Sequence, residues 1–322
     1  LTITAGTGST TISGTIGGTV AVTTLSIGGS GNGTISLAGL GDSDTAGATG
    51  TTTIGNTSTG TLTLPGTIYK TDNSQTYVAA TGQNIDITGD GATFTTTNDN
   101  IAFNTAGVDL SFDGEGEDVV TTIDTGTGIG NVTFGGAIET GGGDDDVLTI
   151  TSGTGTVTFT GNIGATQELG GLNVNASSGS GIITFTGDIG DTNAPQSGVI
   201  GTSNIGNTTT SLINLDGGLY SFDGTTTFES SGAESVEISV ATTIENTANS
   251  LSFSGGSIEL LNGANLSVTT NGGAITVNGV VGTSSETLSI NANHSGGDGS
   301  SGNETVNITG DIGNADEILS VA

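Results

Sequence analysis

Apolar and polar residues alternate along most of the chain in short runs of four to six positions. The runs "TLTL" (Thr61–Leu64), "NIDIT" (Asn84–Thr88) and "VEISV" (Val236–Val240) are typical. A period of two, with β-branched Thr between the apolar positions, predicts β-strands. Gly, Asn and Asp clusters follow at intervals of about 8–12 residues and supply turns. No apolar stripe with helical spacing of useful length occurs, so almost no helix is expected.

A short motif recurs along the chain: two apolar residues two positions apart, then Gly, then an apolar residue and usually a second Gly. It reads "VTFTGNIG" at Val157–Gly164, "ITFTGDIG" at Ile183–Gly190 and "VNITGDIG" at Val306–Gly313. Neighbouring copies are separated by about 25 residues, as from Phe134 to Phe159 and from Phe159 to Phe185. A step of this length fits one coil of a β-solenoid, with Val157 and Phe159 pointing inward.

A longer repeat lies over the short one. The segment "LTITAGTG" at Leu1 returns as "LTITSGTG" at Leu148, and "LSINAN" opens a third copy at Leu288. Tyr69 and Tyr77 correspond to Tyr220 and Phe228 at one common offset. We therefore divide the chain into long repeats at 1–147 and 148–287, with a partial third copy at 288–322. Both ends fall inside repeats, which suggests a window of a longer array.

Together these patterns predict an all-β parallel β-solenoid, a right-handed β-helix that runs continuously over residues 1–322 with coils of about 25 residues. In a solenoid each coil buries its apolar side only against its neighbours. The alternative is a series of tandem β-sandwich modules, which would favour compact units, long hairpins and large core aromatics. The thin, regular coils filled by Val, Ile, Leu and occasional Phe favour the solenoid.

Composition excludes several functions. The chain has 322 residues with 32 acidic ones against one Lys or Arg residue, Lys70, and the formal net charge is −31. Such a chain cannot build a phosphate-neutralising nucleic-acid surface. No run approaches the roughly 18 apolar residues of a membrane span, so no transmembrane helix is expected. The absence of Cys removes disulfides, thiolate metal sites and cysteine catalysis.

Two acidic, Gly-rich turns are candidate calcium sites. "DGEGEDVV" (Asp113–Val120) and "GGGDDDVL" (Gly141–Leu148) approach the pattern G-G-x-G-x-D-x-apolar, in which turn carbonyls and an Asp carboxylate bind Ca²⁺ between coils. Asp118 and Asp146 occupy the Asp position and are separated by about one coil. Asp113 and Asp144 each replace a Gly of the pattern. Plain solvated acidic turns are the alternative.

No enzyme is expected. Carboxylates are plentiful enough to consider a glycosidase or lyase on a solenoid. However, Arg is absent, Lys70 is the sole Lys, and the single His, His294, lies in a Gly/Ser/Asp loop. A catalytic site would also break the repeat, whereas both long repeats retain one design.

The passage Val157–Gly190, "VTFTGNIGATQELGGLNVNASSGSGIITFTGDIG", resembles the repeats of large bacterial β-strand-repeat surface proteins. These include surface-layer proteins, filamentous-haemagglutinin-like proteins and autotransporter passengers. The resemblance implies an exported protein at the cell surface that folds outside the cell as a right-handed β-helix. It also implies a role in a lattice, filament or adhesion, and calcium-dependent assembly.

We therefore expect a non-enzymatic, extracellular structural protein that self-assembles as part of a surface layer, filament or sheath, with Ca²⁺ as its cofactor. Its expected partners are other copies of the chain and cell-surface glycans. The alternative is an adhesin or autotransporter stalk whose binding domain lies outside this window. Self-association distinguishes the two, because a stalk should stay monomeric.

Overall fold

The computed structural model describes residues 1–29, 31, 33–104, 107–110, 119–141, 146–191, 198–283, 285–292, 305–313 and 320–321. The chain forms two compact units, unit 1 at Leu1–Gly161 and unit 2 at Asn162–Ala322. All regular elements in these described ranges are β-strands. None of the described residues forms a helix long and apolar enough to cross a membrane.

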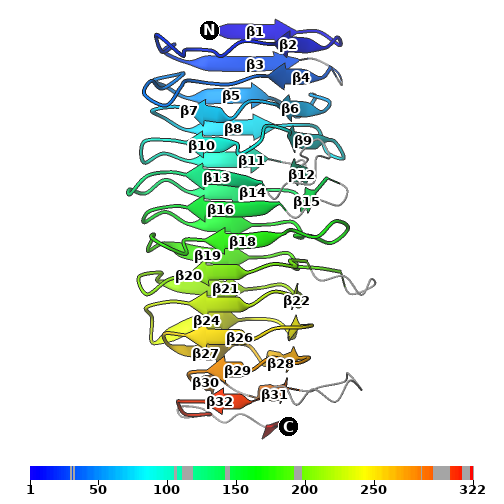
Figure 1. Cartoon of the computed structure of the whole chain (residues 1–322), viewed down its shortest axis with the longest axis vertical. Helices are drawn as coiled ribbons and strands as arrows, with labels where there is room; N and C mark the ends of the chain where they lie inside the picture. The colour runs from blue at the N-terminus through cyan, green and yellow to red at the C-terminus, as the bar shows by residue number, and fades with distance from the viewer. Residues whose placement is uncertain are drawn as a thin grey trace. The chain divides into compact units, whose positions relative to one another are not determined.

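In unit 1 the chain winds through three parallel sheets, named A, B and C in chain order (Figure 1). Sheets A and B gain a strand per coil from the first coil onward, whereas the strands of sheet C begin at β7, after isolated bridges at Ile16 and Leu40. Sheet A contains β1 (Thr2–Ala5), β3 (Leu25–Gly29), β5 (Thr52–Gly55), β8 (Gln75–Val78), β11 (Ile101–Asn104), β14 (Val132–Phe134) and β17 (Val157–Phe159). Sheet B contains β2 (Thr10–Ile12), β4 (Ile35–Leu37), β6 (Leu62–Leu64), β9 (Asn84–Ile87), β12 (Gly107–Leu110) and β15 (Ile138–Thr140). Sheet C contains β7 (Ile68–Lys70), β10 (Thr93–Thr95), β13 (Val120–Asp124) and β16 (Val147–Thr151).

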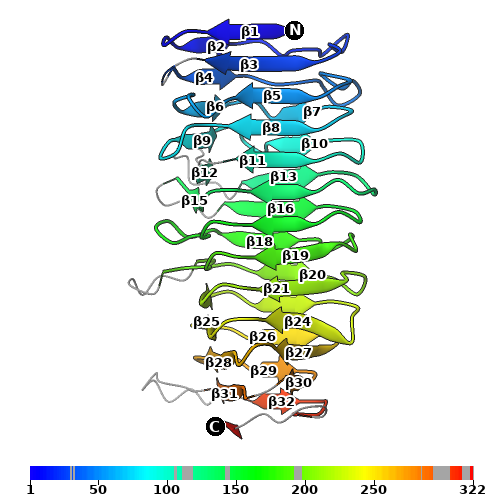
Figure 2. The same cartoon turned by 180° about the vertical axis from the view of Figure 1, so that it is seen from behind.

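Unit 2 has the same plan, with sheets named D, E and F (Figure 2). Sheet D contains β19 (Ile182–Phe185), β21 (Leu212–Leu215), β24 (Glu234–Ile238), β27 (Ser257–Leu260) and β30 (Val280–Gly282). Sheet E contains β22 (Leu219–Phe222), β25 (Thr242–Asn246), β28 (Asn265–Thr270), β31 (Thr287–Ala292) and β33 (Ser320–Val321). Sheet F contains β18 (Gly171–Val174), β20 (Ser203–Gly206), β23 (Thr226–Glu229), β26 (Leu251–Ser254), β29 (Ile275–Val277) and β32 (Val306–Ile308).

The predicted all-β parallel solenoid is confirmed. In sheet A, Thr53 pairs with Thr76, and Ala102 pairs with Thr133. The first of these steps is shorter, and the second longer, than the predicted coil of about 25 residues. The alternative of β-sandwich modules is wrong, because sandwiches are built from antiparallel sheets. The predicted handedness, and the continuity of one solenoid over residues 1–322, stay predictions.

Inward positions stack in register inside each unit, as the alternation predicted. In sheet A one interior column carries Tyr77, Phe103, Phe134 and Phe159, all at most 1% exposed. Their rings stack with centroids 5.1, 5.0 and 5.4 Å apart. In sheet F the corresponding column of unit 2 holds one stacked pair, Phe228 and Phe253, at 5.1 Å. Apolar and aromatic contacts between successive coils therefore form the core.

The predicted equivalence of Tyr69 and Tyr220 is visible in their hydrogen bonds. The Tyr69 hydroxyl donates to the carbonyl oxygen of Leu37 at 2.8 Å and accepts from the Gly66 N–H at 2.9 Å. The Tyr220 hydroxyl donates to the carbonyl oxygen of Phe185 at 3.2 Å and accepts from the Gly217 N–H at 2.7 Å. Burial raises the pKa of both phenols. Each Tyr therefore joins two coils of its own unit through a neutral, buried hydroxyl.

A glycine ends the equivalent strands β5 and β20. Gly55 and Gly206 both have φ +82°, a left-handed conformation that favours Gly. A Cβ at Gly55 would collide with the carbonyl oxygen of Val78, and one at Gly206 with that of Glu229. Both contacts are with the next coil. The motif "IGNT" at Ile54 and Ile205 is thus set by close coil-to-coil packing.

The long repeat does not contain a whole number of coils. From β1, sheet A passes through β3, β5, β8 and β11 to β14 in five coils, and β15 and β16 then add strands in sheets B and C. The segment "LTIT" therefore lies in sheet A at β1 and in sheet C at β16. In unit 2, β18 and β33 occupy the same position in successive copies of the long repeat, and they likewise lie in different sheets, F and E. Each copy of the long repeat is thus displaced by one sheet.

Candidate functional site

Of the four predicted calcium ligands, only Asp146 lies within the described residues, whereas Asp113, Asp118 and Asp144 lie outside them. Asp146 is fully buried, and its Oδ1 accepts a hydrogen bond from the Val119 N–H at 3.4 Å. The part of the chain that the structure describes contains no group of three or more Asp, Glu or His arranged to hold a metal ion. Calcium at these turns stays a prediction.

Of the two basic side chains considered for catalysis, only Lys70 lies within the described residues. Lys70 belongs to unit 1, where its Nζ donates to the carbonyl oxygen of Ser43 at 2.7 Å. His294 lies outside the described residues. Lys70 thus holds a loop of its own unit through the backbone.

An acid row runs along sheet B of unit 1. Asp86, Asp109 and Glu139 are in-register partners on β9, β12 and β15. Burial raises the pKa of Asp109 to about 6, and the neighbouring charges of Asp86 and Glu139 contribute to the same shift. Burial also raises the pKa of Asp86. Like charges on directly opposite positions destabilise a sheet. This row was not predicted, because it becomes visible only when the strands are placed in register.

The equivalent positions in unit 2 keep part of this chemistry. Glu237 and Glu259 are in-register partners on β24 and β27 of sheet D, and they correspond to Asp86 and Asp109 in the long repeat. Val281 on β30 takes the place of Glu139. Both copies therefore carry neighbouring carboxylates, each on a different sheet of its own unit.

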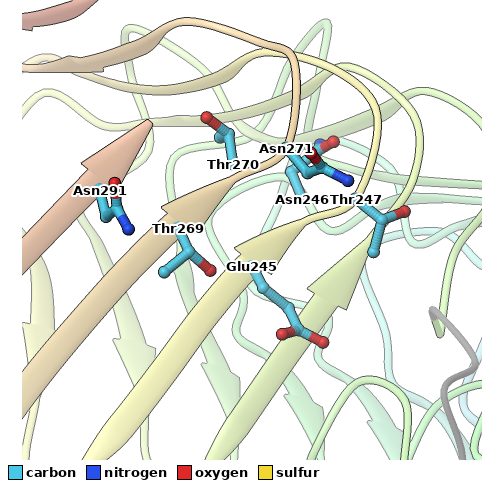
Figure 3. A pocket seen from close by; sticks show the side chains of 7 residues that line it. All are labelled: Glu245, Asn246, Thr247, Thr269, Thr270, Asn271 and Asn291. Carbon is cyan, nitrogen blue, oxygen red and sulfur yellow. The ribbon is translucent and has the colours of Figure 1, made fainter. Parts of the chain in front are cut away.

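A shallow hollow of about 260 Å³, lined by Thr, Asn and Glu, lies on sheet E of unit 2 (Figure 3). The outward residues Glu245, Thr269 and Asn291 form one in-register row across β25, β28 and β31. We call these three residues the sheet E row. Figure 3 shows them side by side along the three strands, with the corner residues at the strand ends and just beyond them. These corner residues are Asn246, Thr247, Thr270 and Asn271.

Side-chain hydrogen bonds fix the corner of the hollow. Asn246 is 1% exposed; its Nδ2 donates to the carbonyl oxygen of Gly224 at 2.6 Å, and its Oδ1 accepts from the Asn249 N–H at 2.6 Å. The Thr270 hydroxyl donates to the carbonyl oxygen of Gly273 at 2.6 Å. The hollow is therefore lined by hydroxyl, amide and carboxylate groups on a rigid frame.

The sheet E row was not predicted. Its signal in the sequence is the difference between the two long repeats at outward positions. Glu245, Thr269 and Asn291 correspond to Thr95, Asp124 and Thr151 in sheet C of unit 1, which are also in-register partners. Ser221, next to Glu245, corresponds to Lys70. An alignment of the copies that marks inward and outward positions would have shown this change of chemistry.

Comparison with known proteins gives no match: no family model, no curated protein and no solved structure matches the chain. The resemblance to bacterial surface proteins, and the extracellular location it implies, stay predictions.

Proposed function

We propose that the chain is a non-enzymatic structural segment of an extracellular surface layer, filament or sheath that self-assembles. The observation that carries this proposal is the in-register stacking of successive coils within each unit. Inside, the columns are apolar, as at Tyr77, Phe103 and Phe134. Outside, short side chains continue from strand to strand, as at Thr53, Thr76, Ala102 and Thr133. Regular stacking of this kind supports a role that depends on rigidity and repetition rather than on one reactive centre.

Calcium is part of the proposal because the chain carries a large negative charge. The chain carries a formal net charge of −31, and in unit 1 the acid row brings Asp86, Asp109 and Glu139 onto adjacent strands. Repulsion between such surfaces opposes the approach of two copies. Divalent cations reduce this repulsion, so assembly should be favoured by Ca²⁺. Screening of the negative charges is sufficient for this effect, and no dedicated metal site is required.

Electron microscopy of the purified chain, first with calcium and then with a chelator, tests the proposal. We expect ordered sheets or filaments with calcium and their loss with chelator. The double variant Asp109→Asn with Glu139→Gln should assemble at lower calcium, because it removes two charges of the acid row. The matched control, Asp72→Asn with Asp90→Asn, removes two exposed charges outside the row. Absence of ordered assemblies in every condition would favour a monomeric stalk and contradict the proposal.

A further inference from the structure

We propose that the hollow on sheet E of unit 2 binds a neutral saccharide through the side chains of Glu245, Thr269 and Asn291. This inference goes beyond the structural role and does not depend on self-assembly, because every residue that carries it belongs to unit 2 of a single chain.

The three side chains of the sheet E row have polar atoms left for a ligand. Glu245 Oε1 accepts a hydrogen bond from the Ser221 hydroxyl at 2.8 Å, which orients the carboxylate. Within the described chain, Glu245 Oε2, the Thr269 hydroxyl and the Asn291 amide make no side-chain hydrogen bond. A carboxylate oxygen accepts, whereas a hydroxyl and an amide both donate and accept. The row therefore offers the mixture of acceptors and donors that sugar hydroxyls need.

The spacing of the row fits a ligand with several hydroxyl groups. Glu245, Thr269 and Asn291 are Cα partners on adjacent parallel strands, which lie about 4.8 Å apart. The ligand must therefore present polar groups at intervals along the stacking direction rather than at one point. A chain of sugar rings presents hydroxyls in this way, whereas a compact ion can contact only one or two positions of the row.

The lining of the hollow argues against other classes of ligand. An anion would find no Lys or Arg side chain, because Lys70 is the chain's one Lys or Arg residue and belongs to unit 1. An apolar ligand would find no aliphatic or aromatic side chain in the lining, which consists of Thr, Asn and Glu. A metal ion would find a single carboxylate, that of Glu245, whereas protein calcium sites usually gather about six to eight oxygen ligands. A neutral, hydroxyl-rich molecule fits all three constraints.

The fixed corner of the hollow favours binding, and its openness limits affinity. Asn246 and Thr270 hold the turn through buried hydrogen bonds, so little order has to be gained on binding. The lining has no aromatic side chain for ring stacking. We therefore expect a dissociation constant of about 1 mM for a trisaccharide, which corresponds to only a few net hydrogen bonds.

Saturation-transfer NMR on the full 322-residue chain tests the inference, with mannotriose, cellotriose and tri-N-acetylchitotriose as probes. A chelator in the buffer keeps the measurement independent of calcium-driven assembly. Glu245→Gln retains an oxygen for the Ser221 bond but places a donor where Oε2 accepts. It should weaken binding of the responding trisaccharide roughly tenfold, as expected for one hydrogen bond to a charged group. Asn291→Ala should weaken it by a smaller factor.

Asp124→Asn is the matched control, because it removes one carboxylate from the equivalent row on sheet C of unit 1. It should leave the affinity unchanged. Equal melting temperatures for all variants would show that the site, and not the fold, has changed. Failure of all three trisaccharides to bind would overturn the inference, and so would unchanged binding in Glu245→Gln or an equal loss in Asp124→Asn. Calcium binding at Glu245 without saccharide binding would assign the row to a cation and would also overturn it.

Discussion

The two units differ most on their outer rows and least in their interiors. Inward positions keep their character: Tyr77 and Phe103 in unit 1 correspond to Phe228 and Phe253 in unit 2, and all four are fully buried. Outward positions change in charge, since Lys70 corresponds to Ser221 and Thr95 to Glu245. The comparison teaches that stacking restricts the inner face, because each inward side chain must fit the coil on either side. Side chains on the outer face are not restricted in this way, so outward residues can change in charge and in hydrogen-bonding groups.

The largest expected effect tests the interior half of this comparison. Phe103 stacks on Tyr77 and Phe134 and meets Phe94 edge-on at 5.3 Å, whereas Phe253 has one stacked ring partner, Phe228. Phe103→Ala should lower the free energy of unfolding of unit 1 by about 5 kcal/mol, the upper end for buried Phe truncations. Phe253→Ala should lower that of unit 2 by about 3 kcal/mol, because fewer ring contacts are lost.

Hydrogen exchange read by mass spectrometry, with peptides from each unit, measures both losses separately. Protection should fall around the substituted coil and in its own unit. A loss under about 1 kcal/mol at Phe103 would mean that the inward and outward faces are assigned the wrong way round.

A smaller effect is expected at the paired tyrosines. Tyr69→Phe leaves the Leu37 carbonyl oxygen and the Gly66 N–H without their shared hydroxyl, and Tyr220→Phe does the same to Phe185 and Gly217. Each change should cost about 2 kcal/mol, since buried polar groups lose their partner. Urea unfolding of the two variants measures the costs. Clearly unequal costs would show that the two tyrosines share a hydrogen-bond geometry but differ in their contribution to stability.

The acid row gives a pH dependence that unit 1 should show. The pKa of Asp109 lies at about 6 in the folded chain, above its ordinary value of 3.8. The folded state therefore keeps this proton while the unfolded state has released it. The contribution of protonated Asp109 to the free energy of unfolding is thus fully present below about pH 4 and is lost as the pH rises through about 6. Asp109→Asn should remove this fall and raise the melting temperature at neutral pH. A variant that melts below the parent chain at neutral pH would contradict the argument.

The smallest expected effects concern the outer rows. Asp124 Oδ1 accepts a hydrogen bond from the Gly126 N–H at 2.7 Å, and an Asn side chain keeps that acceptor. Asp124→Asn and Glu245→Gln should each change stability by less than about 0.5 kcal/mol in thermal melts. A larger loss in either variant would mean that the outer rows contribute to packing, against the contrast drawn between inside and outside.

Much of the fold was predictable from alternation and repetition. The period of about 25 residues, the parallel stacking and the burial of Val157 and Phe159 all follow from spacing in the sequence, because inward positions must recur once per coil. The displacement of the long repeat by one sheet was not predictable. The sheet that a strand joins depends on the lengths of all preceding coils. These lengths vary, since the short coil after Glu237 ends at its partner Glu259, whereas the long coil after Ala102 ends at Thr133.

The candidate sites were less predictable for the same reason. The acid row and the sheet E row each join residues from three coils, so they appear only when the register is known. Asp118, one member of the predicted calcium pair, lies outside the described residues, so its pairing with Asp146 stays a prediction. Register, rather than composition, therefore decides which acidic residues meet.

Distances between spin labels along sheet A test the central claim, in-register stacking of one strand per coil, most directly. The chain has no Cys, so labels can be placed cleanly on outward positions. The row Thr53, Thr76, Ala102, Thr133 and Thr158 predicts Cα separations of about 14 Å for the pair Thr53 and Thr133, and about 19 Å for Thr53 and Thr158. A rise of about 4.8 Å from the first pair to the second would support the account. Distances that do not increase with the number of coils would contradict it.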